Sequence, residues 1–324
     1  MIEPGSPTVV ALGGGHGLAA TLSALRLMSD RITAVVTVAD DGGSSGRLRD
    51  ELDVLPPGDL RMALAALCDD SDWGRTWRDV LQHRFTSAGD LDQHAVGNLL
   101  IVALWELLDD PVAGLDWVGR LLNARGRVLP MASVPLLIEA DVRDPVTGLA
   151  RVVSGQSRVA LTTDRIEQLR LVPNDPPACA ESVAAILDAD WVVLGPGSWF
   201  SSVLPHLLVP EISAALHRTR ARRCITLNLE SDDGETYGLT ATDHLDVLRA
   251  HAPGLRIDAV VADPTSVEDV GALSAATAEL GADLLLRQVR RGDGSARHDP
   301  LRLAAAYRDV FEGVVGDVPY GRRD

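Results

Sequence analysis

Short apolar runs alternate with helical patterns along most of the chain, and four of the six runs are followed directly by glycine or aspartate. These runs predict strands over residues 8–12, 32–39, 190–194, 223–229, 257–262 and 283–289. Because the runs are largely apolar rather than alternating, they are typical of parallel strands covered by helices on both faces. Repeated strand–helix units of this kind predict an α/β fold with a three-layer, Rossmann-like and mostly parallel sheet.

The pattern changes in the middle of the chain, over about residues 127–171. Short β-like pieces at residues 134–140 and 151–153 are bounded there by turn residues. Such pieces indicate antiparallel strands joined by tight turns. We therefore expect a single α/β domain over residues 1–324, with a small inserted antiparallel lobe at about residues 127–171.

The first predicted strand runs into the glycine turn Gly13-Gly14-Gly15-His16-Gly17. Glycines allow the backbone to approach a ligand closely, and the free N–H groups of the helix that follows favour an anion. Gly14, Gly15 and His16 are therefore candidate phosphate contacts. For His16 a hydrogen bond to phosphate is the plainer role, and a role as general acid or base is the alternative.

The second predicted strand ends in Asp40-Asp41-Gly42-Gly43-Ser44. Doubly wound sheets bind their ligands at the carboxyl ends of strands, so Asp40, Asp41 and Ser44 are candidate ligand contacts. Carboxylate oxygens suit Mg²⁺, which makes Asp40 and Asp41 the candidate ligands if a metal is bound. Asp40 also lies about where a Rossmann acid would meet a ribose hydroxyl, so a dinucleotide site remains a rival interpretation. A helix cap within a plain turn is the structural alternative.

Three further polar residues lie near predicted helix starts. Asp59 can cap the helix that follows it, and Arg61 fits a solvated charge in the first turn of that helix. Asn98 stands near the start of another apolar helix, either as a cap or as a ligand contact. The sequence leaves the two roles of Asn98 open.

A second glycine turn, Gly195-Pro196-Gly197-Ser198, follows the predicted strand at residues 190–194. Gly195 and Gly197 permit close approach of a ligand, and Ser198 supplies a hydroxyl beside a helix start. The alternative is a plain strand-to-helix turn with a serine cap. Because both glycine turns follow strand ends, we expect them to border one crevice.

Composition narrows the classes of function. The formal charge of −16 argues against non-specific binding to nucleic acid or to anionic membranes. All 30 basic residues are arginine, which excludes a phosphate-binding or Schiff-base lysine, so any cationic contact must come from Arg. No apolar run reaches the ~18 residues of a membrane span, and Met1-Ile2-Glu3-Pro4 does not resemble a signal peptide. We therefore expect a cytoplasmic protein.

Taken together, the loop motifs resemble the YvcK, or gluconeogenesis factor, family, and its mycobacterial CuvA branch in particular. The resemblance extends from about residue 8 to residue 311. It rests on the motifs Ala11 to Gly17, Val38 to Arg49, Pro57 to Arg61, Gly97 to Leu99 and Gly195 to Ser198. The family belongs to the CofD-like superfamily, which also contains 2-phospho-L-lactate transferase, an enzyme of coenzyme F420 synthesis.

The resemblance implies binding of a nucleotide sugar of the UDP-N-acetylglucosamine type and a role in cell shape and cell-wall precursor supply during gluconeogenic growth. A homodimer and a regulatory protein partner are expected with it. The implied nucleotide- and phosphate-binding residues are Gly14, Gly15, His16, Asp40, Asp41, Ser44, Asn98, Gly195, Gly197, Ser198, Asn228 and Arg297.

The chain departs from the family pattern in two places. Asp232-Asp233 stands where relatives usually carry Gln-Pro, which loosens the turn and adds negative charge. Pro300 stands where some relatives carry a phosphorylatable threonine, so regulation at that position does not carry over.

Three functions stay open at this point. A nucleotide-sugar-binding regulatory protein is favoured because the motifs match the regulatory branch and no nucleophile–base pair stands out. A Mg²⁺-dependent transferase of the 2-phospho-L-lactate type is the alternative, and whether the protein catalyses any reaction is left open. An NAD(P)-binding oxidoreductase is the third candidate, motivated by the first glycine turn and Asp40.

Overall fold

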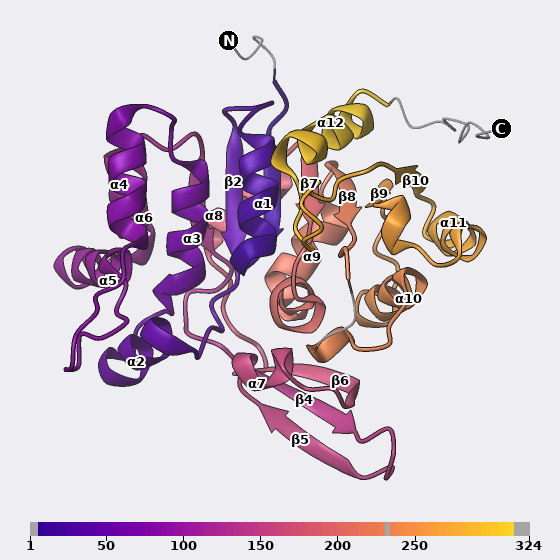
Figure 1. The fold of residues 1–324 in the computed structure, drawn as a ribbon, viewed down its shortest axis with the longest axis horizontal. Coiled ribbons are helices and arrows are strands. Elements are labelled where there is room, and N and C mark those ends of the chain that lie inside the picture. Colours follow the sequence, from indigo (N-terminus) through magenta and orange to yellow (C-terminus); the bar gives the residue numbers. More distant parts are fainter. Residues whose placement is uncertain (1–5, 231–233, 314–324) are drawn as a thin grey trace.

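The computed structural model describes residues 6–230 and 234–313, and its centre is a sheet of seven parallel strands (Figure 1). The strand order is β10-β9-β8-β7-β1-β2-β3. Every neighbouring pair runs parallel, which confirms the predicted fold class. The strands are β1 Val9–Gly13, β2 Ile32–Val36, β3 Arg127–Pro130, β7 Trp191–Leu194, β8 Arg222–Thr226, β9 Ala259–Ala262 and β10 Asp283–Leu286.

The order of the sheet reverses at β1, which pairs with β2 on one side and with β7 on the other. Consecutive strands are therefore added in opposite directions from this point. The loops that leave the carboxyl ends of β1 and β7 diverge to opposite faces and leave a crevice between them. Both predicted glycine turns lie at this switch point.

Helices cover both faces of the sheet (Figure 1), with α1 packed against both α3 and α12, and α8 packed against α9. None of the described helices combines the length and the apolar character that a membrane-spanning segment needs. Their bounds are α1 Gly15–Leu25, α2 Gly43–Leu52, α3 Pro57–Leu67, α4 Asp72–Gln82, α5 Val96–Leu108, α6 Pro111–Leu121, α7 Gln156–Ala160, α8 Ala180–Asp188, α9 Pro210–Arg218, α10 Ala241–His251, α11 Val270–Glu279 and α12 Pro300–Phe311.

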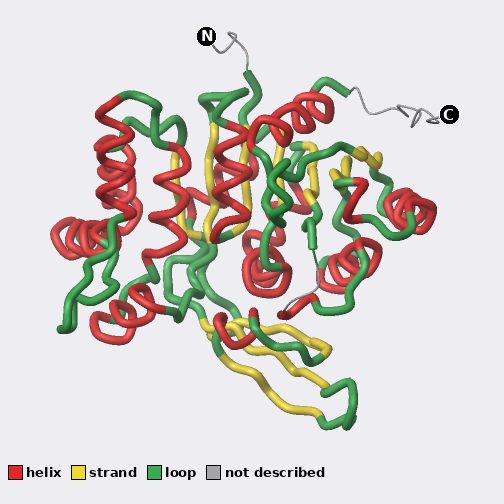
Figure 2. Tube along the Cα trace, in the orientation of Figure 1, coloured by secondary structure: helices red, strands yellow, loops and turns green. Residues whose placement is uncertain are grey.

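A separate antiparallel sheet forms the lobe seen as the lowest group of strands in Figure 2. Its strands, in the order β5-β4-β6, are β4 Leu137–Arg143, β5 Ala150–Ser154 and β6 Arg165–Val172. The prediction placed the start of this lobe at about residue 127, and that boundary is wrong because β3 pairs with β2 in the large sheet. A four-residue strand at a sheet edge is too short for its pattern to reveal which sheet it joins.

The second strand is shorter than its apolar run. β2 ends at Val36, although Val38 and Ala39 are fully buried. Between them, the Thr37 N–H donates to the Gly13 carbonyl at 3.0 Å and its hydroxyl donates to the Ser202 carbonyl at 2.9 Å. The segment is buried between the end of β1 and the π-helical turn at Trp199–Val203, although it does not continue the strand.

A buried chain of hydroxyl groups links α12 to the centre of the fold. The Thr21 hydroxyl donates to the Gly195 carbonyl at 3.0 Å, so the Tyr307 hydroxyl, 3.3 Å away, must donate to Thr21. Thr226 then donates to the Tyr307 oxygen at 2.9 Å. Because all three side chains are fully buried, this chain fixes α12, α1 and β8 around the carbonyl of Gly195.

Replacing Tyr307 by phenylalanine should lower the free energy of unfolding by about 1–2 kcal/mol, because two buried threonine hydroxyls each lose a partner. The measurement is equilibrium unfolding in urea. Leu301→Ala is the matched control on the same helix, since that side chain is 72% exposed, and it should change the stability by less than about 0.5 kcal/mol. Equal stability of the Tyr307→Phe variant and the wild type would show that the hydroxyl chain contributes nothing.

Candidate functional site

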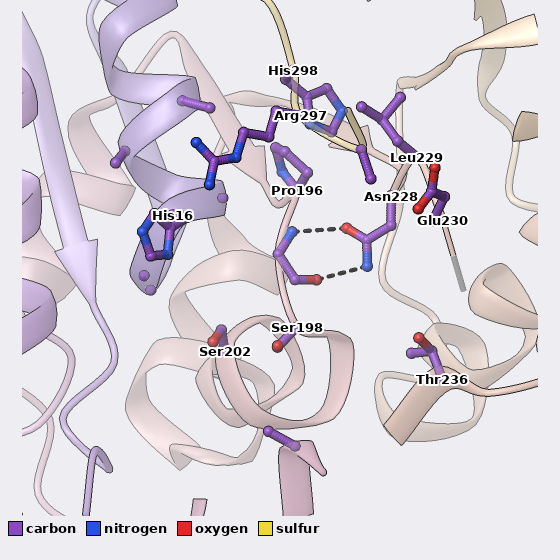
Figure 3. A pocket seen from close by; sticks show the side chains of 18 of the residues that line it. His16, Pro196, Ser198, Ser202, Asn228, Leu229, Glu230, Thr236, Arg297 and His298 are labelled. Carbon is purple, nitrogen blue, oxygen red and sulfur yellow. Dashed lines mark hydrogen bonds between the residues drawn. The ribbon is translucent and has the colours of Figure 1, made fainter. Parts of the chain in front are cut away.

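A cavity of about 610 Å³ opens at the carboxyl ends of β1 and β7, bordered by the start of α1 and by the segment that leads into α12 (Figure 3). Seven of the residues predicted from sequence line it together. They are Gly14, Gly15, His16, Gly197, Ser198, Asn228 and Arg297. Gly195 stands immediately before the lining residue Pro196.

The first glycine turn forms one wall of the cavity. Gly14 is the N-cap of α1 and offers no side chain, so the helix begins without a side-chain cap. Gly15 has a φ of +56°, a conformation that glycine adopts most readily. A Cβ on Gly17 would lie 2.2 Å from the Pro196 carbonyl oxygen, so this glycine allows the two turns to touch. Residue 14 itself therefore supplies no side-chain cap to the N-terminal N–H groups of α1.

The second glycine turn is fixed by Asn228, which follows β8. The Gly197 N–H donates to Asn228 Oδ1 and Asn228 Nδ2 donates to the Gly197 carbonyl, both at 2.9 Å (Figure 3). Both ends of the Asn228 amide are thus occupied by backbone. The asparagine lines the cavity, but the part it plays is to hold Gly197 in place.

The helical turn after Ser198 is a π-helical turn at Trp199–Val203, and a buried acid caps it. Glu235 Oε1 accepts the Phe200 N–H at 2.9 Å and the Ser201 N–H at 3.4 Å. Burial raises the pKa of Glu235 to about 7, against the lowering effect of these hydrogen bonds. Sequence reasoning did not single out Glu235; its position directly after a glycine in the loop beyond β8 was the available signal.

Two cationic side chains and one imidazole line the part of the cavity formed by the segment before α12. Arg297 extends toward His16 from the opposite wall (Figure 3), and Arg291 lines the same side. His298 is 9% exposed, and burial lowers its pKa to about 4, so it is neutral at pH 7. Positive charge in the cavity therefore comes from arginine, as the absence of lysine requires.

Asp59 is a cavity residue that the sequence interpretation assigned to another role. It was expected to cap its own helix, but Pro56 is the N-cap of α3 and Asp59 lies inside the first turn. Its carboxylate accepts the Gly15 N–H, and a Cβ on Gly14 would lie 2.5 Å from Asp59 Oδ2. Burial and then the charge of Asp40 raise the pKa of Asp59 to about 7, while Gly15 and Arg61 lower it.

Four predicted site residues do not line this cavity: Asp40, Asp41, Ser44 and Asn98. Asp41 Oδ1 accepts the Ser157 N–H at 2.9 Å and the Ser157 hydroxyl at 2.6 Å, so it fastens the short helix α7. Asp40 accepts the Gly42 N–H at 3.0 Å within its own turn.

These bonds do not fit a metal held jointly by Asp40 and Asp41. Asp41 is engaged with α7, and the described residues contain no group of three His, Cys, Asp or Glu side chains that could hold a metal ion. Adjacent carboxylates in sequence thus point to different partners. We derive no chemistry through a metal at this position.

Asn98 and Ser44 lie in a buried polar cluster beside the cavity. Arg61 Nε donates to Asn98 Oδ1 at 2.8 Å, and Asn98 Nδ2 donates to the Ser44 hydroxyl at 3.0 Å. Arg61 is 3% exposed, so the prediction of a solvated first-turn charge is wrong. Its position one turn into an apolar helix gave no sign that the neighbouring helix would cover it.

Only one of the two departures from the family pattern lies within the described residues. Asp232 and Asp233 lie outside the described residues. Pro300 is the first residue of α12 and lines the cavity. Proline is well suited to a first helical position because its missing N–H has no partner there.

Comparisons with known proteins agree over nearly the whole chain. A protein of Mycobacterium tuberculosis is 52% identical over 315 residues, which cover 95% of this chain and 91% of that protein. The gluconeogenesis factor of Bacillus subtilis is 38% identical over 263 residues, covering 81% of this chain and 80% of its own length. The crystal structure of a protein from Bacillus halodurans matches with a TM-score of 0.83 and 33% identity, covering 94% of this chain and 99% of that one.

The family model described as 2-phospho-L-lactate transferase CofD matches residues 9–283, from the start of β1 to the start of β10. The matched region contains both glycine turns and the Asp40 loop. With this match and with relatives above 30% identity over most of its length, the chain belongs to the CofD family, and its close relatives include gluconeogenesis factors.

Proposed function

We propose that the protein is a regulatory protein that binds a nucleotide sugar of the UDP-N-acetylglucosamine type. One observation carries this proposal: two glycine turns, each leading into a helical turn, open into the same 610 Å³ cavity opposite Arg297. A cavity of this size is in the range that takes ligands of nucleotide size.

The diphosphate is assigned to the wall formed by the start of α1. Free N–H groups at a helix N-terminus and the helix dipole both favour phosphate there. Arg297 faces this wall and offers a planar fork of donors that matches phosphate oxygens. His16 lies on the same wall, with Arg297 extending toward it, and we assign it as a further donor to the diphosphate.

The remainder of the cavity is lined by groups that suit a sugar or a nucleoside. Asn228, Leu229 and Glu230 form one side, and Thr236 is buried at another. The hydroxyl of Thr236 can bind a sugar hydroxyl by hydrogen bonding, while Asn228 holds Gly197 and Glu230 is paired with Arg290, so these two shape this wall. The cavity therefore combines an anion-binding wall with a polar wall, as a ligand with a charged centre and uncharged polar ends requires.

A binding role is favoured over catalysis by what surrounds the cavity. Among the described residues that line it, no serine hydroxyl is hydrogen-bonded to a histidine. Among the described residues, the one hydrogen bond between a serine hydroxyl and a histidine ring joins Ser44 to His94, and it lies outside the cavity. A role in cell shape and cell-wall precursor supply during gluconeogenic growth is part of the same proposal, since the Bacillus subtilis relative is a gluconeogenesis factor.

A transferase of the 2-phospho-L-lactate type is a second candidate, because the buried carboxyl group of Asp59 faces the cavity beside Gly15. A carboxyl group with a pKa near the working pH is suited to proton transfer. Mass spectrometry after incubation with Mg²⁺, an activated phospholactate nucleotide and a deazaflavin acceptor tests this directly. Product formation would establish that the protein is a transferase. If no product forms while the nucleotide sugar binds, the binding function is supported instead.

UDP-N-acetylglucosamine should bind the wild-type protein in isothermal titration calorimetry, and Arg297→Gln should weaken binding by about tenfold or more because a charge-assisted hydrogen bond to phosphate is lost. Arg308→Gln, an exposed position on α12, is the matched control with the same change in charge and unchanged affinity. Absence of binding heat with the wild-type protein would refute the proposal.

NAD should not raise the melting temperature of the protein, since only a ligand that binds the native state does so. A higher melting temperature with NAD, and none with the nucleotide sugar, would favour the oxidoreductase.

As the pH is raised from 5 to 8, the Asp59→Asn variant should become more stable relative to the wild type by about 2 kcal/mol. The folded pKa of Asp59 is about 7, above the unfolded value of 3.8, so the wild-type contribution is present at low pH and is lost as the pH rises toward 7. Asparagine keeps an acceptor for Gly15 and does not ionise. Urea unfolding at both pH values measures the difference, and Glu235→Gln should behave alike. A pH-independent difference would contradict the raised pKa.

A further inference from the structure

The antiparallel lobe has two edge strands, and only one of them is protected against pairing with another chain. β6 is one edge of this sheet and β5 is the other, on the outer border of the lobe in Figure 1. Along β6, Glu167 is an extra residue that breaks the register between Asp141 and Val142 of β4. A bulge of this kind twists an edge away from further pairing, and the charged side chains of β6 hinder pairing as well.

The backbone bonds between β4 and β5 show which groups of β5 face outward. β5 pairs with β4 without a break in register, and no other described strand pairs with it. The Gly155 N–H donates to the Ile138 carbonyl at 2.8 Å, so residue 155 and every second residue before it bond toward β4. The N–H and carbonyl groups of Ala150, Val152 and Ser154 therefore point away from β4.

The side chains of these three residues carry no charge, and Val152 is 56% exposed. Arg151 is the one charged residue of β5, and it is directed to the opposite face of the sheet, where it is paired with Asp164 at 2.7 Å. The outer edge of β5 thus combines outward-facing backbone groups with small or apolar side chains. An edge of this composition is a template for another strand.

Exposed apolar side chains are concentrated on the same lobe. Among the described residues, sixteen large hydrophobic side chains are exposed, and five of them belong to the lobe: Val146, Leu149, Val152, Leu161 and Val172. The lobe, residues 137–172, is 36 of the 324 residues, so its share is nearly three times that of an even distribution. A concentration of this kind marks a surface that contacts another protein.

Charge decides which protein fits this surface. The whole chain has a formal charge of −16, so its surface in general repels a second copy of itself. The lobe carries none of that charge, because residues 137–172 contain five carboxylates and five arginines. These are Glu139, Asp141, Asp144, Asp164 and Glu167, with Arg143, Arg151, Arg158, Arg165 and Arg170. A neutral lobe does not select an acidic or a basic partner, but it allows two copies of this chain to meet without repulsion.

We propose that the lobe is a self-association surface, on which β5 of one copy pairs antiparallel with β5 of a second copy. The two three-stranded sheets then become one six-stranded sheet around a two-fold axis. The favoured register places Val152 opposite the partner's Val152, because Ala150 then lies opposite the partner's Ser154 and all three outward-facing residues are used. A register centred on Arg151 would instead place it opposite the partner's Arg151, where like charges repel.

The paired segment is short, so the dimer is expected to be weak and to depend on concentration. Because no residue of β5 lines the large cavity, this inference goes beyond the proposed ligand-binding function and does not depend on it. It assigns a role to the lobe, which ligand binding leaves without one apart from α7.

Sedimentation velocity of the full chain, from low micromolar to submillimolar concentration, tests the inference. The wild type should form dimers as the concentration rises. Val152→Glu places two carboxylates opposite each other at the two-fold axis and removes an apolar pair, so it should raise the dissociation constant of the dimer by about tenfold or more. Val270→Glu is the matched control, because Val270 is similarly exposed on α11, and it should leave the dissociation constant unchanged.

A mixing experiment tests the two-fold axis itself. Val152→Arg alone should dissociate as Val152→Glu does, whereas an equimolar mixture of the two variants should dimerise again, because a carboxylate then faces a guanidinium. Variants that failed to fold could not rescue one another, so dimerisation of the mixture also shows that both are folded. A wild type that stays monomeric throughout, a dimer that Val152→Glu leaves unchanged, or a mixture no more dimeric than either variant alone would each overturn the proposal.

Discussion

The close contact between the two glycine turns is the constraint on which the rest of the site depends. Gly17 and the Pro196 carbonyl meet at a distance that excludes any side chain. Thr37, after the end of β2, binds the carbonyls of Gly13 and Ser202, Asn228 holds Gly197, and the Tyr307 hydroxyl chain reaches Gly195. Residues far apart in sequence thus converge on a few backbone carbonyls at the switch point of the sheet, and the cavity takes its shape from their positions.

The fold could be predicted from sequence because its signals are local. Apolar runs that end in glycine or aspartate locate the strands, and the confirmed parallel order follows from their alternation with helices. The errors arose where burial depends on a partner distant in sequence. Residues 37–39 were predicted as strand because they are buried, although the strand ends at Val36. Arg127–Pro130 was predicted to belong to the lobe because the pattern of four residues does not show which strand they pair with.

In the candidate site, too, the features contained in consecutive residues could be predicted, and those that depend on distant partners could not. Glycine turns were recognisable because their chemistry is contained in consecutive residues, and they do border one cavity. The acids Asp59 and Glu235 were missed because each caps a helical turn other than its own, which only the tertiary structure reveals. Arg61 was misread for the same reason, since a first-turn arginine is normally solvated unless another helix covers it. Adjacent Asp40 and Asp41 suggested a shared ligand, whereas their partners lie in different elements.

Asp59 connects these observations, because its ionisation depends on both sides of the wall that it forms. The Gly15 N–H on the cavity side and Arg61 on the far side are the two influences that favour its carboxylate, while burial and Asp40 oppose them. An anion placed at the start of α1 would compete with Asp59 for the Gly15 N–H and so would favour the protonated acid. A protonated Asp59 can in turn donate a hydrogen bond, which an ionised one cannot. The protonation state of this one carboxyl group and the occupancy of the α1 wall by an anion are therefore expected to depend on each other.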